Sequence, residues 1–286
     1  MTLMSKNNII RMVAASLSTL LLIAGSGCGS SATSSESSQA QSITEETLVP
    51  GTLTIATGEP AYAPYVIDNK PESGKGFESA VAYAVAEKMG FTKDHVKWTR
   101  TTFDAAIAPG TKDYDMNIQQ FSITPERKKA VDFTPAYYNS TQSVLIKSDS
   151  KYANAKSLNE IKSGSIGAMV GSTSYTFAKS KIKDDIQTFN DNVSLAQALD
   201  SKQVDAIVFD TPAAVQAIQS GQIKDGKILG QIEGSTDPEG AGIVLPKDSK
   251  LTKAASKAVT DLTKDGTMKK LQETWLKEYN DIPVLK

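Results

Sequence analysis

The stretch SITPERKKAVDF, residues 122–133, marks the end of a short apolar strand and the start of a helix. Thr124 suits the N-cap of that helix and Pro125 its first position. Arg127 follows in the first turn, where bare backbone N–H groups already carry partial positive charge, at a cost of about 0.3–1 kcal/mol. A carboxylate or phosphate bound between Arg127 and these N–H groups would reverse that sign. The alternative is a surface arginine paired with a nearby acid, and the spacing alone does not separate the two.

On both sides of this stretch, short apolar segments alternate with helical ones, which predicts an α/β protein. The expected strands are 52–57, 95–101, 114–120, 143–147, 165–170, 204–210 and 240–246. The expected helices are 76–90, 102–112, 157–164, one beginning at Tyr175, 193–203, 211–221, 251–266 and 267–279.

Two strands, near 141–146 and 239–245, bracket a second α/β unit. We therefore expect two α/β lobes joined by a two-strand hinge. Lobe 1 would comprise 48–142 and 241–286, and lobe 2 would comprise 143–240. Because ligands of open α/β sheets bind beyond the carboxyl ends of the strands, four loops are nominated. They follow Thr57, Gln120, Val170 and Phe209.

These loops offer groups of opposite charge on different lobes. Arg127, with the backbone amide of Thr173 at another helix start, would form an anion site. Asp210, at the end of a buried strand, would accept a cation, although Asp is equally a standard N-cap. A zwitterion in a cleft between the lobes would satisfy both sites at once. Tyr62 and Phe103 could sandwich a ligand side chain, whereas packing in a lobe core is the commoner role of such residues.

The first residues are typical of a secretory signal peptide, predicted here over 1–27. Lys6 and Arg11 precede an apolar run from Met12 to Ala24, which is too short to span a bilayer. Cys28, the chain's one cysteine, then stands at the cut site. The segment Gly25-Ser26-Gly27-Cys28 resembles the lipobox of bacterial lipoproteins, which implies that Cys28 is lipidated. Residues 28–47 are rich in Ser, Ala, Thr, Glu and Gln, so we expect a flexible tether that joins the body to this anchor at the cell membrane, outside the cytoplasm. The alternative is plain secretion with an unmodified cysteine.

Composition argues against several classes of function. Without Lys6 and Arg11, the 31 basic residues fall to 29, against 32 acidic ones, so nucleic-acid binding has little support. No metal-ligand spacing is found, and His95, the one histidine, lies in a polar segment. No nucleophile–base pair or carboxylate pair indicates catalysis. We therefore expect a monomeric binding protein without cofactor or metal, not an enzyme.

Five segments together resemble the family 3 extracellular solute-binding proteins, the amino-acid receptors of ABC importers. They are GFESAVAYAVAEKMG (76–90), FSITPERKKAVDFTPAYY (121–138), VGSTSY (170–175), VFDTPAA (208–214) and DGTMKKLQETW (265–275). The resemblance covers nearly all of 50–280. It implies a periplasmic-binding-protein type II fold that closes around an L-amino acid, with an ABC permease and its ATPase as partners.

The resemblance also implies roles for individual residues. Arg127 and Thr173 would hold the α-carboxylate of the ligand, and Asp210 its α-ammonium, joined by groups around Gln120 and Ser122. Tyr62 and Phe103 would enclose the side chain. Glu59 occupies a position where some relatives that bind cationic amino acids carry an acid, which favours a polar, possibly basic, ligand.

Two positions depart from the pattern of this family. Gln119 and Gln120 replace small residues before the S-x-T element, and Ala80 replaces an aspartate. Two other functions remain open on this fold. One is a cyclohexadienyl or arogenate dehydratase, in which Glu59 or Asp210 would be the acid catalyst, and the other is a ligand-sensing module.

Overall fold

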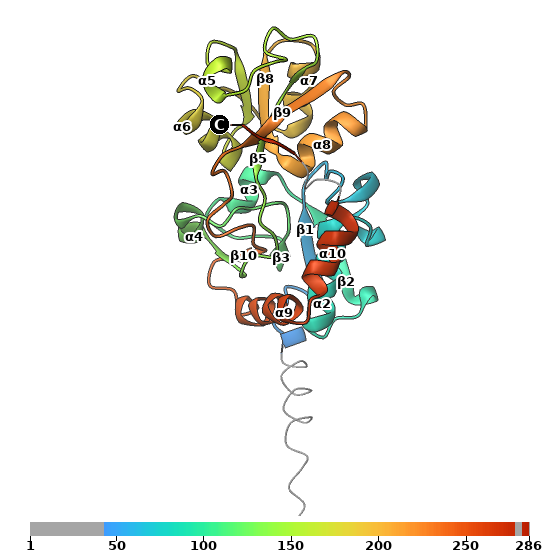
Figure 1. The fold of residues 1–286 in the computed structure, drawn as a ribbon. Coiled ribbons are helices and arrows are strands. Elements are labelled where there is room, and N and C mark those ends of the chain that lie inside the picture. The colour runs from blue at the N-terminus through green and yellow to red at the C-terminus, as the bar shows by residue number, and fades with distance from the viewer. Residues whose placement is uncertain (1–42, 278–281, 286) are drawn as a thin grey trace, which may run out of the picture.

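The computed structural model describes residues 43–277 and 282–285 as two α/β lobes, each built on its own sheet (Figure 1). Lobe 1 holds a five-stranded sheet in the order β2-β1-β3-β10-β4, and lobe 2 a six-stranded sheet in the order β11-β9-β5-β8-β6-β7. The predicted class, two α/β lobes, is confirmed.

The elements of lobe 1 follow the predicted alternation. Its strands are β1 (Leu53–Thr57), β2 (Val96–Arg100), β3 (Met116–Asn117), β4 (Val131–Phe133) and β10 (Val244–Pro246). Its helices are η1 (Ile67–Asn69), η2 (Pro71–Ser73), α2 (Phe77–Lys88), η3 (Lys93–His95), α3 (Phe103–Ile107), α4 (Pro125–Ala130), α9 (Thr252–Lys264) and α10 (Thr267–Leu276).

The strands of lobe 1 are mixed in direction. Strands β2 and β3 run parallel to β1, whereas β10 is antiparallel to both β3 and β4. Buried residues such as Ile55 and Met116 pack one face of the sheet against α2, α9 and α10. This packing leaves the carboxyl ends of β1 and β3 directed toward lobe 2, where Gly58 and Gln119 follow the strands.

Lobe 2 contains the remaining described elements. Its strands are β5 (Gln142–Lys147), β6 (Ile166–Met169), β7 (Gln187–Phe189), β8 (Ala206–Asp210), β9 (Gly226–Ile232) and β11 (Val284–Leu285). Its helices are α5 (Leu158–Ile161), α6 (Thr173–Lys181), α7 (Asn192–Asp200) and α8 (Thr211–Gln219).

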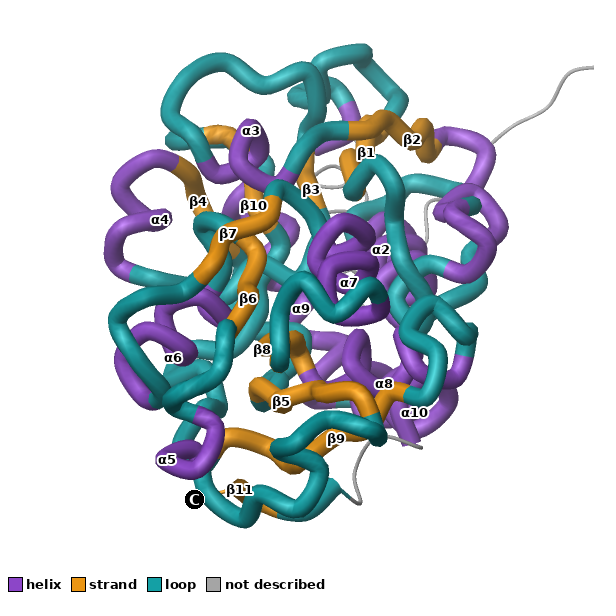
Figure 2. The backbone as a smooth tube through the Cα atoms, turned by 90° about the horizontal axis from the view of Figure 1, so that it is seen from above, coloured by secondary structure: helices purple, strands orange, loops and turns teal. Residues whose placement is uncertain are grey.

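The sheet of lobe 2 is covered on both faces, which explains the unbroken apolar runs 144–146 within β5 and 206–209 within β8. Val144 and Ala206 pack toward α5 and α6 on one face, and Leu145 and Ile207 toward α7 and α8 on the other. In the view from above, α6 and α8 accordingly lie on opposite sides of β5 and β8 (Figure 2). Strand β8 thereby delivers Asp210 to the face of lobe 2 that meets lobe 1.

The two predicted crossovers run side by side. Residues 134–141 lead from β4 to β5, and residues 233–243 lead from β9 to β10. The amide of Ala241 donates to the carbonyl oxygen of Tyr138 at 2.8 Å, and the amide of Tyr137 donates to Ala241 at 2.9 Å. These antiparallel bonds tie the crossovers into a hinge.

The C-terminal strand departs from the expected division of the chain. We expected 241–286 to lie wholly in lobe 1, but Val284 and Leu285 pair with Gln231 and Ile232 of β9. Leu285 is buried in the lobe 2 core. The assignment of 284–285 to lobe 1 was therefore wrong, because this short strand completes an open edge of the lobe 2 sheet and carries no periodic pattern of its own.

The N-terminal boundary also differs from the expectation. Residues 43–47, expected to belong to the tether, pack on lobe 1: Ile43 contacts its core, and Thr47 is buried. Asp115 fixes the segment by accepting from the amide of Leu48 at 2.8 Å. The predicted signal peptide, Cys28 and the rest of the tether lie outside the described residues. No helix in the described ranges is long and apolar enough to cross a membrane.

Candidate functional site

A cavity of about 200 Å³ lies between the lobes, at the carboxyl ends of β1, β3, β6 and β8. All eight residues nominated from the sequence line it. They are Glu59, Tyr62, Phe103, Gln120, Ser122, Arg127, Thr173 and Asp210. The structure thus brings these residues together, while their contact with a ligand stays a prediction.

Arg127 spans the junction between the two lobes. Thr124 caps α4 by accepting from the amide of Arg127 at 3.2 Å, as predicted. The guanidinium donates to the carbonyl oxygens of Ser122 in lobe 1 (2.8 Å) and Gly171 in lobe 2 (2.9 Å). Burial lowers the pKa of Arg127 from its ordinary value, while the Asp237 and Asp210 carboxylates oppose that shift. Arg127 is 8% exposed, so it is not a free surface arginine.

Further contacts show that the lobes are closed on one another. The hydroxyls of Ser122 and Thr173 lie 3.1 Å apart across the cleft. Gly171 adopts a left-handed φ of +70°, and a Cβ at this position would stand 2.9 Å from Oδ1 of Asp104 in lobe 1. Glycine at 171 therefore permits both the turn into α6 and the close approach of the two lobes.

Asp210 is held on lobe 2 by a chain of buried polar groups. Its Oδ1 accepts from Nε2 of Gln142 at 2.6 Å, and Oε1 of Gln142 in turn accepts from the Ser174 hydroxyl. Burial raises the pKa of Asp210 to about 6, and the neighbouring Asp237 carboxylate acts in the same direction. The alternative reading of Asp210 as a plain N-cap is not supported, because its side chain makes no capping bond to α8.

Asp237 adjoins the cavity through the lining residue Ser122 and was missed in the sequence. It lies in the second crossover, is 6% exposed, and accepts from the Ser122 hydroxyl at 2.5 Å. Burial raises the pKa of Asp237, whereas the Ser122 hydrogen bond and Arg127 oppose this. The available signal was an acid in the polar segment 235–239, directly before a predicted hinge strand.

The two aromatic residues flank the cavity in different ways. Burial and the Asp191 carboxylate raise the pKa of Tyr62 to about 12, so this lobe 1 tyrosine lies close to the start of α7 in lobe 2. The Arg127 guanidinium lies over the face of the Phe103 ring, 5.2 Å from its centroid, and the ring centroids of Phe103 and Phe121 are 4.8 Å apart. Phe103 thus supports Arg127 through a cation–π contact in addition to lining the cavity.

Glu59 is paired within its own lobe. Its Oε2 lies 3.6 Å from Nε of Arg100, and its side chain is 56% exposed. Arg100 also donates to the carbonyl oxygen of Gly58 at 2.7 Å and to Oδ1 of Asn69 at 2.6 Å. Arg100 therefore fixes the loop that carries Glu59 and Tyr62, and it balances part of the Glu59 charge.

The two glutamines that departed from the family pattern occupy different environments. Gln120 has a left-handed φ of +53°, which costs a residue with a side chain about 1–2 kcal/mol. Its amide donates to Oε1 of Glu78 at 2.7 Å, and its Nε2 also donates to that carboxylate. Gln119 packs against Gly58, and its buried Oε1 finds no partner among the described residues.

The chain belongs to the bacterial extracellular solute-binding proteins, family 3, whose family model matches residues 53–278. Similar proteins include the L-cystine-binding protein TcyJ of Escherichia coli (strain K12). It is 27% identical over 228 residues, which are 79% of this chain and 82% of that protein.

Two solved structures place this chain in the periplasmic-binding-protein type II fold. An ancestral arginine-binding protein bound to arginine is 32% identical, with a TM-score of 0.66 over 79% of this chain and 98% of that chain. The ancestral amino-acid-binding protein AncCDT-1, a precursor of cyclohexadienyl dehydratase, is 30% identical, with a TM-score of 0.63 over 79% and 95% of the two chains.

Proposed function

We propose that this protein is the extracytoplasmic binding component of an ABC importer and that it encloses a polar L-amino acid between its lobes. The observation that carries this proposal is the placement of Arg127 and Asp210 around one cavity of about 200 Å³. Arg127 would bind the α-carboxylate together with Thr173, which begins α6 and therefore contributes an N–H of the helix start. Asp210 and Ser122 would receive the α-ammonium group. A permease and its ATPase would take up the released ligand.

The charges of the cavity favour a ligand with a cationic side chain. Among the described lining residues, Glu59, Asp191 and Asp210 are acidic, whereas Arg127 alone is basic. A zwitterionic amino acid with a neutral side chain has no net charge, so it would leave the excess of negative charge in the cavity unbalanced. A basic side chain would balance part of that negative charge. The Arg100–Glu59 pair reduces this preference without abolishing it.

Isothermal titration of the purified protein with the twenty L-amino acids and L-cystine tests the proposal. We expect at least one basic or polar amino acid to bind, and to bind more tightly than any apolar one. Absence of binding by the whole panel would overturn the proposed function.

We further propose that a lipid on Cys28 holds the protein at the outer face of the cell membrane. The first described segment, at the blue end of the chain, lies at the end of lobe 1 remote from lobe 2, so an anchor attached there would leave the cleft accessible (Figure 1). Cell fractionation of the wild type and a Cys28→Ser variant tests this anchor. The wild type is expected in the membrane fraction and the variant in the soluble fraction, and equal distributions would refute lipidation.

A second candidate is an enzyme of the dehydratase type. It is favoured by the raised pKa of Asp210, about 6, which suits an acid catalyst near neutral pH, and by the likeness to AncCDT-1. Turnover of prephenate or arogenate, lost in Asp210→Asn, would support this candidate over transport. Binding of amino acids without turnover would reject it.

A further inference from the structure

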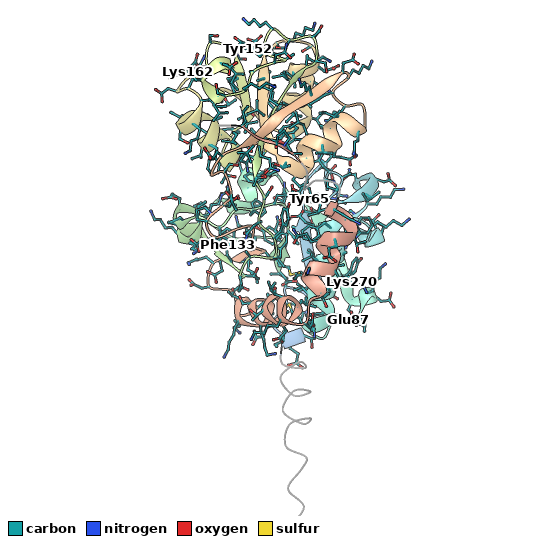
Figure 3. All side chains as sticks on the ribbon, viewed as in Figure 1. Tyr65, Glu87, Phe133, Tyr152, Lys162 and Lys270 are labelled. Atoms are coloured by element: carbon teal, nitrogen blue, oxygen red, sulfur yellow. The ribbon has the colours of Figure 1, made fainter. Side chains whose placement is uncertain are left out.

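Behind the proposed ligand site, Glu78 lies fully buried in the first turn of α2. Its carboxylate accepts from the amide and Nε2 of Gln120 and from the hydroxyl of Tyr137 in the first crossover. These donors come from two segments that meet at the hinge. Tyr65, labelled in Figure 3 at the level where the lobes join, also lies near this carboxylate.

Gln120 is the residue through which Glu78 reaches the cavity. It lines the cavity, yet its backbone is in the left-handed region at φ +53°. The ionised carboxylate of Glu78 can only accept hydrogen bonds, so in this form it fixes which end of the carboxamide faces it. The NH₂ group must turn toward Glu78, and Oε1 therefore points away from it. Two donors of one residue bound to one carboxylate also hold the backbone in its strained conformation.

We propose that Glu78 is a positioning residue of the ligand site, which acts by holding Gln120 in the left-handed conformation with acceptor atoms left for a ligand. The inference rests on the proposed function for its ligand, a cationic group that these acceptors suit, and goes beyond it in assigning a role to a residue that does not line the cavity. Glu78 supplies a conformational restraint at Gln120 that a glycine would not need.

The protonation of Glu78 should make the contact between Glu78 and Gln120 depend on pH. Burial raises the pKa of Glu78 to about 7, while its bonds from Tyr137 and Gln120 oppose the shift and the Asp210 carboxylate adds to it. The charged or titratable groups around Glu78 are thus Tyr137 on the first crossover, Tyr65 on the loop after β1, and Asp210 at the end of β8. The Gln120 amide signal is therefore expected to shift with pH around neutrality.

The test combines a ligand-free and a ligand-bound measurement on the folded, leaderless protein. In ¹⁵N NMR, the backbone amide and the side-chain NH₂ of Gln120, assigned by their change in Gln120→Gly, should titrate with a midpoint near pH 7. Glu78→Gln should abolish this titration, and Tyr137→Phe, which removes one stabilising donor, should move the midpoint upward. A Gln120 backbone amide signal that is the same in Glu78→Gln as in the wild type would overturn the proposal.

The second measurement is a double-mutant cycle, with L-arginine as the probe in isothermal titration. Glu78→Gln should weaken the binding of L-arginine about tenfold in the wild-type background. In the Gln120→Gly background it should weaken binding less than twofold, because glycine adopts the left-handed conformation without help from Glu78. Equal factors in the two backgrounds would show a merely structural role and overturn the proposal. Ser79→Ala, at the next and equally buried residue, is the matched control and should leave the affinity unchanged.

The two measurements keep this inference distinct from the proposed function. If the wild-type protein binds neither L-arginine nor any other amino acid, the proposed function fails, and the positioning role in ligand binding fails with it. The effect of Glu78→Gln on the Gln120 signal then still decides whether Glu78 holds the loop. If L-arginine binds and Glu78→Gln leaves the Gln120 signal unchanged, the inference alone fails.

Discussion

The guanidinium of Arg127 and the carbonyl oxygen of Gly171 lie 2.9 Å apart, which joins a buried cation of lobe 1 to the turn that opens α6 in lobe 2. The same guanidinium is bound to the Ser122 carbonyl oxygen at 2.8 Å. Arg127 is therefore both part of the proposed carboxylate site and a link between the closed lobes. If the proposed function holds, lobe closure and ligand binding both use this one side chain.

Replacement of Arg127 should consequently impair binding severely. We expect Arg127→Ala to weaken the affinity for the preferred amino acid at least 100-fold, about 2.7 kcal/mol, because a buried carboxylate loses its charged partner. Arg127→Lys should retain only a small part of the affinity that Arg127→Ala loses, since lysine cannot contact two carbonyl oxygens and a carboxylate in fixed geometry. Titration calorimetry measures both variants. An affinity of Arg127→Ala within threefold of the wild type would remove Arg127 from the site.

The affinity should also depend on pH through Asp210. Its pKa of about 6 in the unliganded protein means that it is protonated at lower pH, whereas an ammonium ligand requires the ionised form. Asp210 by itself should thus leave the affinity constant above about pH 7 and lower it toward tenfold per pH unit below pH 6, and comparison with Glu78→Gln separates this effect from the titration of Glu78. Asp210→Asn, measured over the same range, should bind weakly with little pH dependence. A wild-type affinity that rises as the pH falls would contradict this assignment.

The stability of the unliganded protein should have the opposite pH dependence in the same region. The pKa of Glu78 is raised from 4.5 to about 7, so the folded protein binds this proton more tightly than the unfolded chain. The stabilisation is complete below pH 4.5 and is lost as the pH rises through 7, by about 3 kcal/mol. Urea unfolding at pH 5, 6 and 7 should show a smaller decrease in Glu78→Gln. An equal decrease in both proteins would assign the effect to other groups.

The close approach at Gly171 can be tested with a matched glycine. Gly171→Ala places a methyl group 2.9 Å from Asp104 and strains a φ of +70°, so we expect about tenfold weaker ligand binding. Gly221→Ala introduces a similar strain at φ +74° where no atom lies within 4 Å. It should lower stability without a specific effect on affinity. Equal affinities of the two variants would show that the lobes do not need this contact.

The sequence was sufficient for the fold class and for bringing together the principal cavity residues. Strand and helix periodicity is local, and the rule that sites lie at carboxyl ends of strands then selects the loops of Arg127 and Asp210. The contacts that could not be predicted are long-range. Ser122 and Asp237 are separated by 115 positions, and Glu78 and Gln120 by 42. No periodicity encodes such a pair, and the two residues of β11 are too few to form a pattern.

The most direct test of the central claim is calorimetric titration of the preferred amino acid beside two analogues, one lacking the α-carboxylate and one with an acetylated α-amino group. For L-arginine these are agmatine and Nα-acetyl-L-arginine. If Arg127 and Asp210 hold the two ends of the zwitterion, each analogue should bind at least 100-fold more weakly than the amino acid. Binding of either analogue as tightly as the amino acid would contradict the account.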